Sequence, residues 1–226
     1  MNEKRIGGQK LKKTVLALLK EKDAHDGLKR LCMFPARQVV NPLIQLLNSP
    51  EEPIKWRSVT ALGAVVSHLA EKNMESAREV MRRLMWQLNS ESGGIGWGSA
   101  EAMGEIMACH EKLANEYVSI LLSYIDRGEN FIENENLQKG ILWALGRLGH
   151  VRPLLLEEGA SLLLPFLRSK NIHLRGLAAW TARAIGSDVT RDLLTQLSED
   201  TTSLTLYING HLRVCQVRVL ASSDYT

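Results

Sequence analysis

The sequence predicts an all-α protein in which pairs of helices stack into a solenoid, with a small β-hairpin near the C-terminal end. Three observations lead to this fold class. One pattern recurs along the middle of the chain, and hydrophobic residues make up 45% of the sequence although aromatic residues make up only 5%. The hydrophobic period then changes from helical to alternating near residue 204. Helix-period stripes that repeat every 20–50 residues or so are typical of helical repeat proteins.

The repeated unit is an apolar helix that ends in Ala-Leu-Gly or a similar triplet. Its copies end at Gly63, Gly104 and Gly146, which are 41 and 42 residues apart. The copies are IKWRSVTALG from Ile54, IGWGSAEAMG from Ile95, LQKGILWALG from Leu137, and a looser fourth copy, LRGLAAW, from Leu174. No single copy can bury its own apolar stripe, so the copies must stack on one another.

At these residues the chain resembles the HEAT-repeat family, in particular the bacterial HEAT-like repeats of the phycobilisome lyase type. The inner helix of that family follows a pattern like V-R-x-x-A-x-x-A-L-G, and its apolar and small positions match here over roughly residues 35 to 200. Lys55, Gly96 and Gln138 replace the arginine of the pattern, and Arg175 retains it. The resemblance implies a right-handed, armadillo-like α-solenoid of HEAT-like helix pairs. It says little about function, because a fold does not carry a site.

The chain divides into three parts. We expect residues 1–8 to form a flexible N-terminus, residues 9–200 to form the solenoid, and residues 201–226 to form a hairpin and tail packed on the last repeat. The solenoid begins with an atypical pair of helices, the first ending near Lys22 and the second starting after a predicted N-cap at Asp23.

The repeats that follow alternate between outer and inner helices. Pro35 opens the first outer helix, and Pro42 inside that helix should kink it. Kinked outer helices are common in the HEAT family, so Pro42 supports the resemblance. The expected outer helices are 74–90, 114–126 and 154–169, the expected inner helices are 53–71, 95–112, 134–149 and 172–186, and a final helix covers 190–197.

The tail carries the signal for a β-hairpin. Apolar and polar residues alternate from Leu204 to Ile208, Asn209-Gly210 follows, and the apolar pattern resumes at Leu212. Asn-Gly between two such runs predicts a two-residue type I′ turn, which needs positive φ at both positions. An isolated hairpin is only marginally stable, so this one must pack against the solenoid.

Composition limits the function classes. The net charge of +3 is modest for a nucleic-acid-binding protein. Cys32, Cys109 and Cys215 are far apart with no C-x-x-C, which argues against a zinc ribbon or a redox motif and fits reduced thiols. No run approaches the ~20 apolar residues of a membrane span, and no signal-peptide core is present. We therefore expect a cytoplasmic protein without membrane segments.

No pattern in the sequence indicates a metal or a cofactor. His68, His110 and His150 lie near the ends of successive inner helices, but His-carboxylate iron sites need more ligands than this chain offers. We expect neither a metal site nor a cofactor.

The concave side of the solenoid holds the candidate binding residues. At 100° per residue, four of the five tryptophans fall on the side of the inner helices opposite the outer helices, and charged residues flank them. We expect Trp97 and Trp143 to be close together and partly accessible; the alternative is that each indole completes packing between repeats. Glu105 and Arg147 are expected to pair between adjacent repeats. The candidate surface comprises Trp56, Trp97, Glu101, Glu105, Lys139, Trp143, Arg147, Trp180 and Arg183.

The pattern favours a non-catalytic scaffold that binds a protein or peptide along its concave face, with no catalytic residue assigned. One alternative is a nucleic-acid partner, as in a DNA-binding or DNA-repair protein. Trp97, Glu101, Trp143 and Arg147 are similar in kind to the groove of HEAT-like alkylpurine DNA glycosylases. A further alternative is a lyase or chaperone for a protein-bound cofactor, although no cysteine maps to the groove. The sequence specifies neither the partner nor the oligomeric state.

Overall fold

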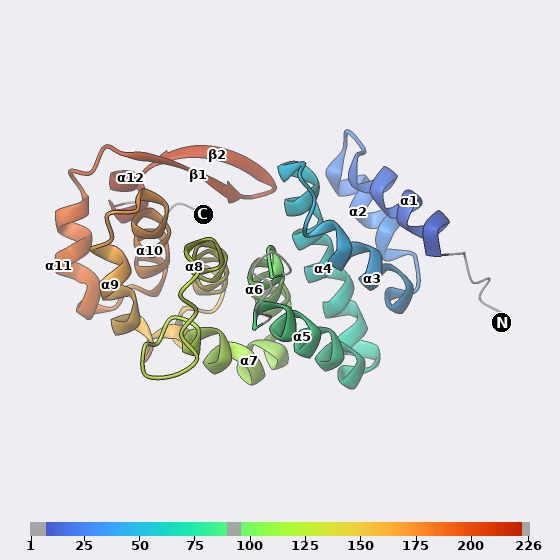
Figure 1. Cartoon of the computed structure of the whole chain (residues 1–226), viewed down its shortest axis with the longest axis horizontal. Coiled ribbons are helices and arrows are strands. Elements are labelled where there is room, and N and C mark those ends of the chain that lie inside the picture. The colour runs from blue at the N-terminus through green and yellow to red at the C-terminus, as the bar shows by residue number, and fades with distance from the viewer. Residues whose placement is uncertain (1–7, 90–95, 223–226) are drawn as a thin grey trace.

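Helices of a single stack form most of the computed structural model, which describes residues 8–89 and 96–222 (Figure 1). The chain starts with α1 (Gly8–Leu19) and α2 (Ala24–Cys32), the predicted atypical pair. Asp23 is the N-cap of α2, and its carboxylate accepts hydrogen bonds from the main-chain N–H groups of His25 and Asp26, as predicted. Residues 1–7, where the flexible N-terminus is expected, lie outside the described residues.

Four helices form the inner row of the stack, at the predicted places. They are α4 (Glu52–Lys72), α6 (Ser99–Cys109), α8 (Glu135–Gly149) and α10 (Ile172–Ile185). A Cβ atom on Gly104 of α6 would lie 2.5 Å from the Cα of Ala144 on α8, and one on Gly146 of α8 would lie 2.3 Å from the Trp180 ring on α10. The glycine that ends each repeat is therefore explained by the close approach of the next inner helix.

The outer helices pack along one side of the inner row. They include α3 (Ala36–Leu46), with Pro42 inside it, α5 (Met74–Leu88) and α7 (Glu111–Ser123). The expected outer helix 154–169 is instead two 3₁₀ turns, η1 (Pro153–Leu156) and η2 (Ala160–Leu163), and one turn of α-helix, α9 (Leu164–Leu167). Pro165 and Gly159 account for the break, because proline cannot donate within a helix and glycine weakens one.

The chain ends in α11 (Asp188–Leu197), the predicted hairpin, and α12 (Val217–Ser222), which packs on α10. Strands β1 (Ser203–Ile208) and β2 (His211–Gln216) are antiparallel. The φ angles of 49° at Asn209 and 80° at Gly210 are those of a type I′ turn. The turn prediction is confirmed.

The hairpin extends well beyond the last repeat. Figure 1 shows it running along the side of the inner row opposite α5 and α7, from α12 at one end towards α4 at the other. β1 is the strand nearer the inner helices in this view. The hairpin therefore covers much of the side on which the candidate surface was predicted.

In the described part of the chain, no helix combines the length and apolar character needed to cross a membrane.

Candidate functional site

Three of the four predicted tryptophans are buried, two of them against the hairpin. Trp56, Trp143 and Trp180 are only 8%, 4% and 2% exposed, whereas Trp97 is 49% exposed. The expectation that Trp143 is partly accessible is wrong, because β1 lies over it. Trp180 packs against Gly146 of the preceding inner helix, which is the packing between repeats that the sequence left as an alternative.

Tyr207 of β1, which the sequence analysis did not single out, joins the hairpin to the inner row. Its ring stacks on Trp56 with centroids 4.6 Å apart and planes 10° apart. The Trp143 indole Nε1 donates to the Tyr207 main-chain oxygen at 2.9 Å, and the Tyr207 and Thr60 hydroxyl oxygens are 3.0 Å apart. Burial raises the pKa of Tyr207, so the hydroxyl stays protonated at neutral pH. The sequence signals a hairpin through its local pattern, but it carries no signal for where the hairpin packs.

Two acidic residues of α6 are buried between basic residues from its two neighbours. Lys55 of α4 donates to Glu101 at 2.7 Å. Arg147 of α8 binds both carboxylate oxygens of Glu105, at 2.7 and 3.2 Å. The predicted ion pair between Glu105 and Arg147 is confirmed, and Glu101 has an equivalent partner on the other side. Both acids therefore link adjacent repeats.

A groove of about 540 Å³ lies at the N-terminal ends of the inner helices, with β1 as one wall. We call it the β1 groove. Its volume is within the range of about 300–1,000 Å³ that is usual for ligand pockets. Five of the nine predicted surface residues line it: Trp56, Trp97, Glu101, Lys139 and Trp143. The other four, Glu105, Arg147, Trp180 and Arg183, do not.

The accessible part of the β1 groove combines one aromatic ring with cationic groups. Trp97 precedes Gly98, whose positive φ of 79° suits glycine and where a Cβ atom would lie 2.9 Å from the Cβ of Leu47. The Lys139 ammonium donates to the Asn136 side-chain oxygen at 3.2 Å. His173 also lines the groove, and burial together with the neighbouring Lys139 lowers its pKa.

One buried donor beside the groove is unsatisfied. Among the described residues, the indole Nε1 of Trp56 has no hydrogen-bond partner, although Lys55 lies 5.0 Å above the Trp56 ring. Buried polar groups in proteins are rarely left without a partner.

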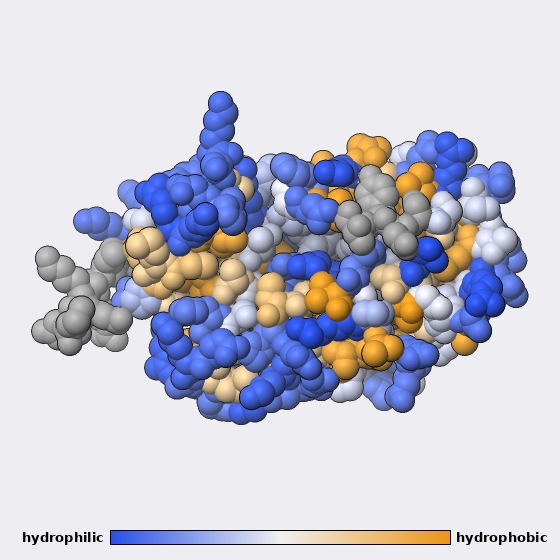
Figure 2. Space-filling model, turned by 180° about the vertical axis from the view of Figure 1, so that it is seen from behind, coloured by the Kyte–Doolittle hydropathy of each residue, from blue (hydrophilic) through white to orange (hydrophobic). Residues whose placement is uncertain are grey.

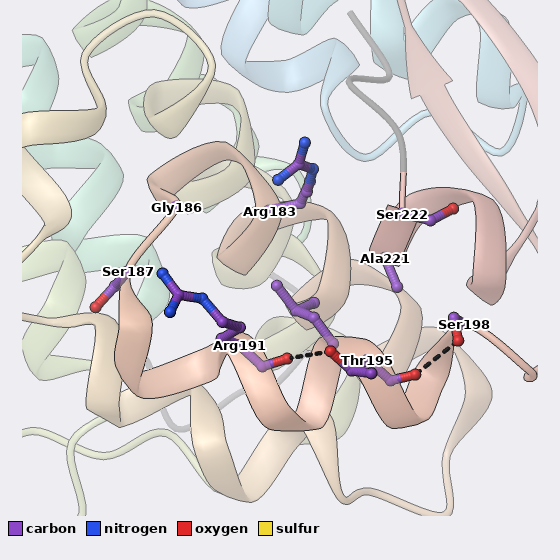
Figure 3. Close-up of a pocket in the computed structure, with 9 residues that line it drawn as sticks. Arg183, Gly186, Ser187, Arg191, Thr195, Ser198, Ala221 and Ser222 are labelled. Carbon is purple, nitrogen blue, oxygen red and sulfur yellow. Dashed lines mark hydrogen bonds between the residues drawn. The ribbon is translucent and has the colours of Figure 1, made fainter.

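Arg183 lies at a different place from the groove. It borders a separate pocket of about 370 Å³ between α10, α11 and α12, together with Arg191 and Ser187 (Figure 3). Arg191 pairs with Asp188 within its own helix. The structure thus does not bring Arg183 together with Trp97.

The outer surface offers no single large apolar face in the view of Figure 2, where hydrophobic residues form small groups among hydrophilic ones. The most exposed large apolar side chains, Met33, Leu154, Val214 and Trp86, lie in different parts of the fold, and Trp86 of α5 is 67% exposed. Scattered exposed hydrophobic residues are normal on protein surfaces. A hollow of about 750 Å³ also lies beside the hairpin turn, lined by residues of α1, α2 and α4. The β1 groove is distinguished by the five predicted surface residues that line it.

The four residues of the glycosylase-like cluster do not share one pocket, because Trp97, Glu101 and Trp143 line the β1 groove and Arg147 does not. Trp143 is covered by β1, Glu101 is paired with Lys55, and Arg147 is paired with Glu105. Glu101, the carboxylate of this set, is therefore not paired with Arg147, and only one of the two tryptophan rings, Trp97, is accessible.

No protein-family model matches this chain, and no curated protein matches it. Similar solved structures include an engineered protein, with 19% identity and a TM-score of 0.49 over 85% of this chain and 90% of that one. A designed armadillo repeat protein in complex with the peptide (KR)4 has 16% identity and a TM-score of 0.49, over 85% and 93%. Another designed armadillo repeat protein has 16% identity and a TM-score of 0.48, over 93% and 96%. TM-scores below 0.5 give no basis for transferring a site or a ligand.

Proposed function

We propose that this chain is a non-catalytic scaffold of HEAT-like repeats that binds a peptide segment of a partner protein in the β1 groove. One observation carries the proposal: the groove gathers five predicted surface residues in one hollow, with the Trp97 ring half exposed at its edge. Exposed tryptophan beside a hollow is a favoured anchor in protein interfaces. The same hairpin that closes the rest of the concave side forms the wall of this groove.

The test is a selection of peptides from a random dodecapeptide library displayed on phage, with the whole chain as bait. Selected peptides are then measured by fluorescence anisotropy on Trp97→Ala and on Trp86→Ala. Trp86 is a matched control, because it is also an exposed tryptophan but does not line the groove. We expect binding to fall at least about tenfold in Trp97→Ala, as for an interface hot spot, and to remain in Trp86→Ala.

Both variants should melt near the wild-type temperature, because changes at exposed positions usually cost little stability. The proposal fails if the library yields no peptide that depends on Trp97.

A further inference from the structure

The hydrogen-bond alternation along the hairpin determines which main-chain groups of β1 are already paired. In an antiparallel pair, residues that exchange both hydrogen bonds alternate with residues whose N–H and C=O point outwards. Ile208 and His211 flank the two-residue turn and are a bonded pair. At the far end, the N–H of Val217 donates to the carbonyl of Thr202 at 2.9 Å.

Both ends of the hairpin give the same alternation. Leu204 and Leu206 bond to β2, so the main-chain groups of the residues between them point away from β2. The outward-pointing residues of β1 are Ser203, Thr205 and Tyr207.

The outward edge of β1 faces the inner helices and the groove. The Trp143 indole donates to the main-chain oxygen of Tyr207, so this edge faces α8. Two residues earlier, Thr205 is exposed and lines the β1 groove, whereas Leu204 and Leu206 beside it are buried. Among the described residues, the main-chain N–H and C=O of Thr205 have no partner beyond the hairpin. The groove thus has an open strand edge as its wall.

Lys139 and His173 lie at the α8 and α10 end of the groove, and in the described structure the Lys139 ammonium is not paired with any carboxylate that lines the groove. Glu135, the first residue of α8, lies outside the groove lining and accepts a hydrogen bond from the Asn171 amide. Of the carboxylates that line the groove, Glu101 is bound to Lys55, and the other begins α4, at the opposite end of the inner row. The N-termini of α8 and α10 also favour negative charge.

We propose that the partner segment binds in extended conformation as a third strand on the open edge of β1, pairs with Thr205, and places an acidic side chain against Lys139 and His173. This rests on the proposed function and specifies how the groove selects its peptide. Strand addition takes its affinity from main-chain hydrogen bonds and its specificity from alternate side chains.

The decisive variant is Thr205→Pro, with Val214→Pro as its matched control. Thr205 and Val214 are cross-strand partners, so the N–H of each points away from the hairpin, one towards the groove and the other towards the open edge of β2. Proline therefore removes one outward donor in each variant and no hydrogen bond between β1 and β2. Any general damage to the hairpin should be similar in the two.

The probe is a phage-selected dodecapeptide that binds wild-type protein and depends on Trp97. We expect its affinity to fall about tenfold or more in Thr205→Pro, because one donor is lost and the added strand is blocked. In Val214→Pro the affinity should change less than about twofold. If both variants lose binding, peptides with single N-methyl groups along the main chain are measured on the wild-type protein. Strand addition requires that N-methylation of every second residue lowers the affinity.

The acidic contact is tested by changing each glutamate or aspartate of the peptide to its amide, with wild-type protein and with Lys139→Gln. One amide change should weaken binding to wild type about threefold to tenfold and have little effect on Lys139→Gln. A Trp97-dependent peptide that tolerates Thr205→Pro and all N-methyl groups overturns strand addition and leaves the proposed function standing. A selection without any Trp97-dependent peptide overturns both.

Discussion

At the scale of single residues, the two buried glutamates of α6 show how charge is held between repeats. Glu105 is bound by Arg147 and Glu101 by Lys55, and each pair joins adjacent inner helices. The Glu105 side chain is only 10% exposed, so water has little access to replace Arg147 as its partner. A buried carboxylate that loses its partner keeps the cost of leaving water and loses the compensating attraction.

Replacing Arg147 by methionine tests this dependence. We expect the free energy of unfolding to fall by about 2 kcal/mol, less than the ~3–5 kcal/mol for a fully buried pair, since Arg147 is 33% exposed. Urea unfolding measures the change. The double variant with Glu105→Gln should recover part of the loss, because the unpaired charge is removed. Equal losses in the single and double variants would show that packing of Arg147 matters and the charge does not.

A second prediction at this scale concerns the pH dependence of peptide binding. Burial and Lys139 lower the pKa of His173 below its ordinary 6.5, so the ring is neutral at pH 7 in the free protein. An acidic side chain bound beside it favours the protonated ring and raises that pKa, so binding takes up a proton. Affinity should therefore rise as the pH falls through the pKa of His173 in the complex and level off below its pKa in the free protein, by up to about tenfold for each unit by which binding raises the pKa.

Anisotropy titrations between pH 5.5 and 8 measure this rise. The peptide carboxylate has an ordinary pKa near 4, so it stays charged throughout this window. In His173→Gln the pH dependence should disappear while binding at pH 8 remains. A pH profile that persists in His173→Gln assigns the titration to another group.

At the scale of elements, Tyr207 joins the hairpin to α4, and Leu204 packs beside Gly176 of α10. The Tyr207 ring stacks on Trp56, and its hydroxyl oxygen is 3.0 Å from the Thr60 hydroxyl oxygen. Tyr207→Phe should cost about 1 kcal/mol, the usual net value of one hydrogen bond. Tyr207→Ala should cost about 3–4 kcal/mol, because it leaves a cavity against Trp56. Chemical denaturation compares the two, and similar losses would mean that the stacking contributes little.

The existence of the hairpin was predictable and its position was not. Alternation and the Asn209-Gly210 turn are local signals, because φ above 0° at both turn positions restricts which residues can occupy them. The contact between Tyr207 and Trp56 joins residues 151 positions apart, and no periodic pattern encodes it. Because the packing position of β1 could not be predicted, Trp143 was expected at the surface. Trp56 and Trp143 lie on the side of the inner row that β1 covers, but the sequence did not show that β1 covers that side.

The outer helices also show that an apolar period alone does not determine the local structure. α5 and α7 follow the predicted apolar period, whereas 154–169 has the period but forms 3₁₀ turns. Gly159 and Pro165 both disfavour a continuous helix there, and the apolar period alone does not show that they outweigh it. Pro42, by contrast, is accommodated inside α3. Proline therefore marks a candidate break, and the packing around it determines the outcome.

At the scale of the whole molecule, the spacing of the inner row depends on the glycine that ends each repeat. A Cβ atom on Gly63 would lie 2.6 Å from Glu105 of the next inner helix. At Gly104 the atoms in the way are the main chain and Cβ of Ala144, which cannot rotate aside. In stacked repeats each unit contacts chiefly its neighbours. A larger side chain between two inner helices therefore changes the spacing between the repeats on either side of it.

Gly104→Ala should therefore lower the free energy of unfolding by about 2 kcal/mol or more, even though alanine favours the helix by about 1 kcal/mol. The matched control is Gly8→Ala in α1, where a Cβ atom would have no neighbour within 4 Å, so stability should be unchanged or slightly higher. Adding Ala144→Gly to Gly104→Ala should restore only part of the loss, because a Cβ on Gly104 would also lie 2.5 Å from the Cα of residue 144. Thermal and urea unfolding measure all three. If Gly104→Ala is as stable as the control, then α6 and α8 can separate without cost, and the repeat glycines do not set the spacing of the solenoid.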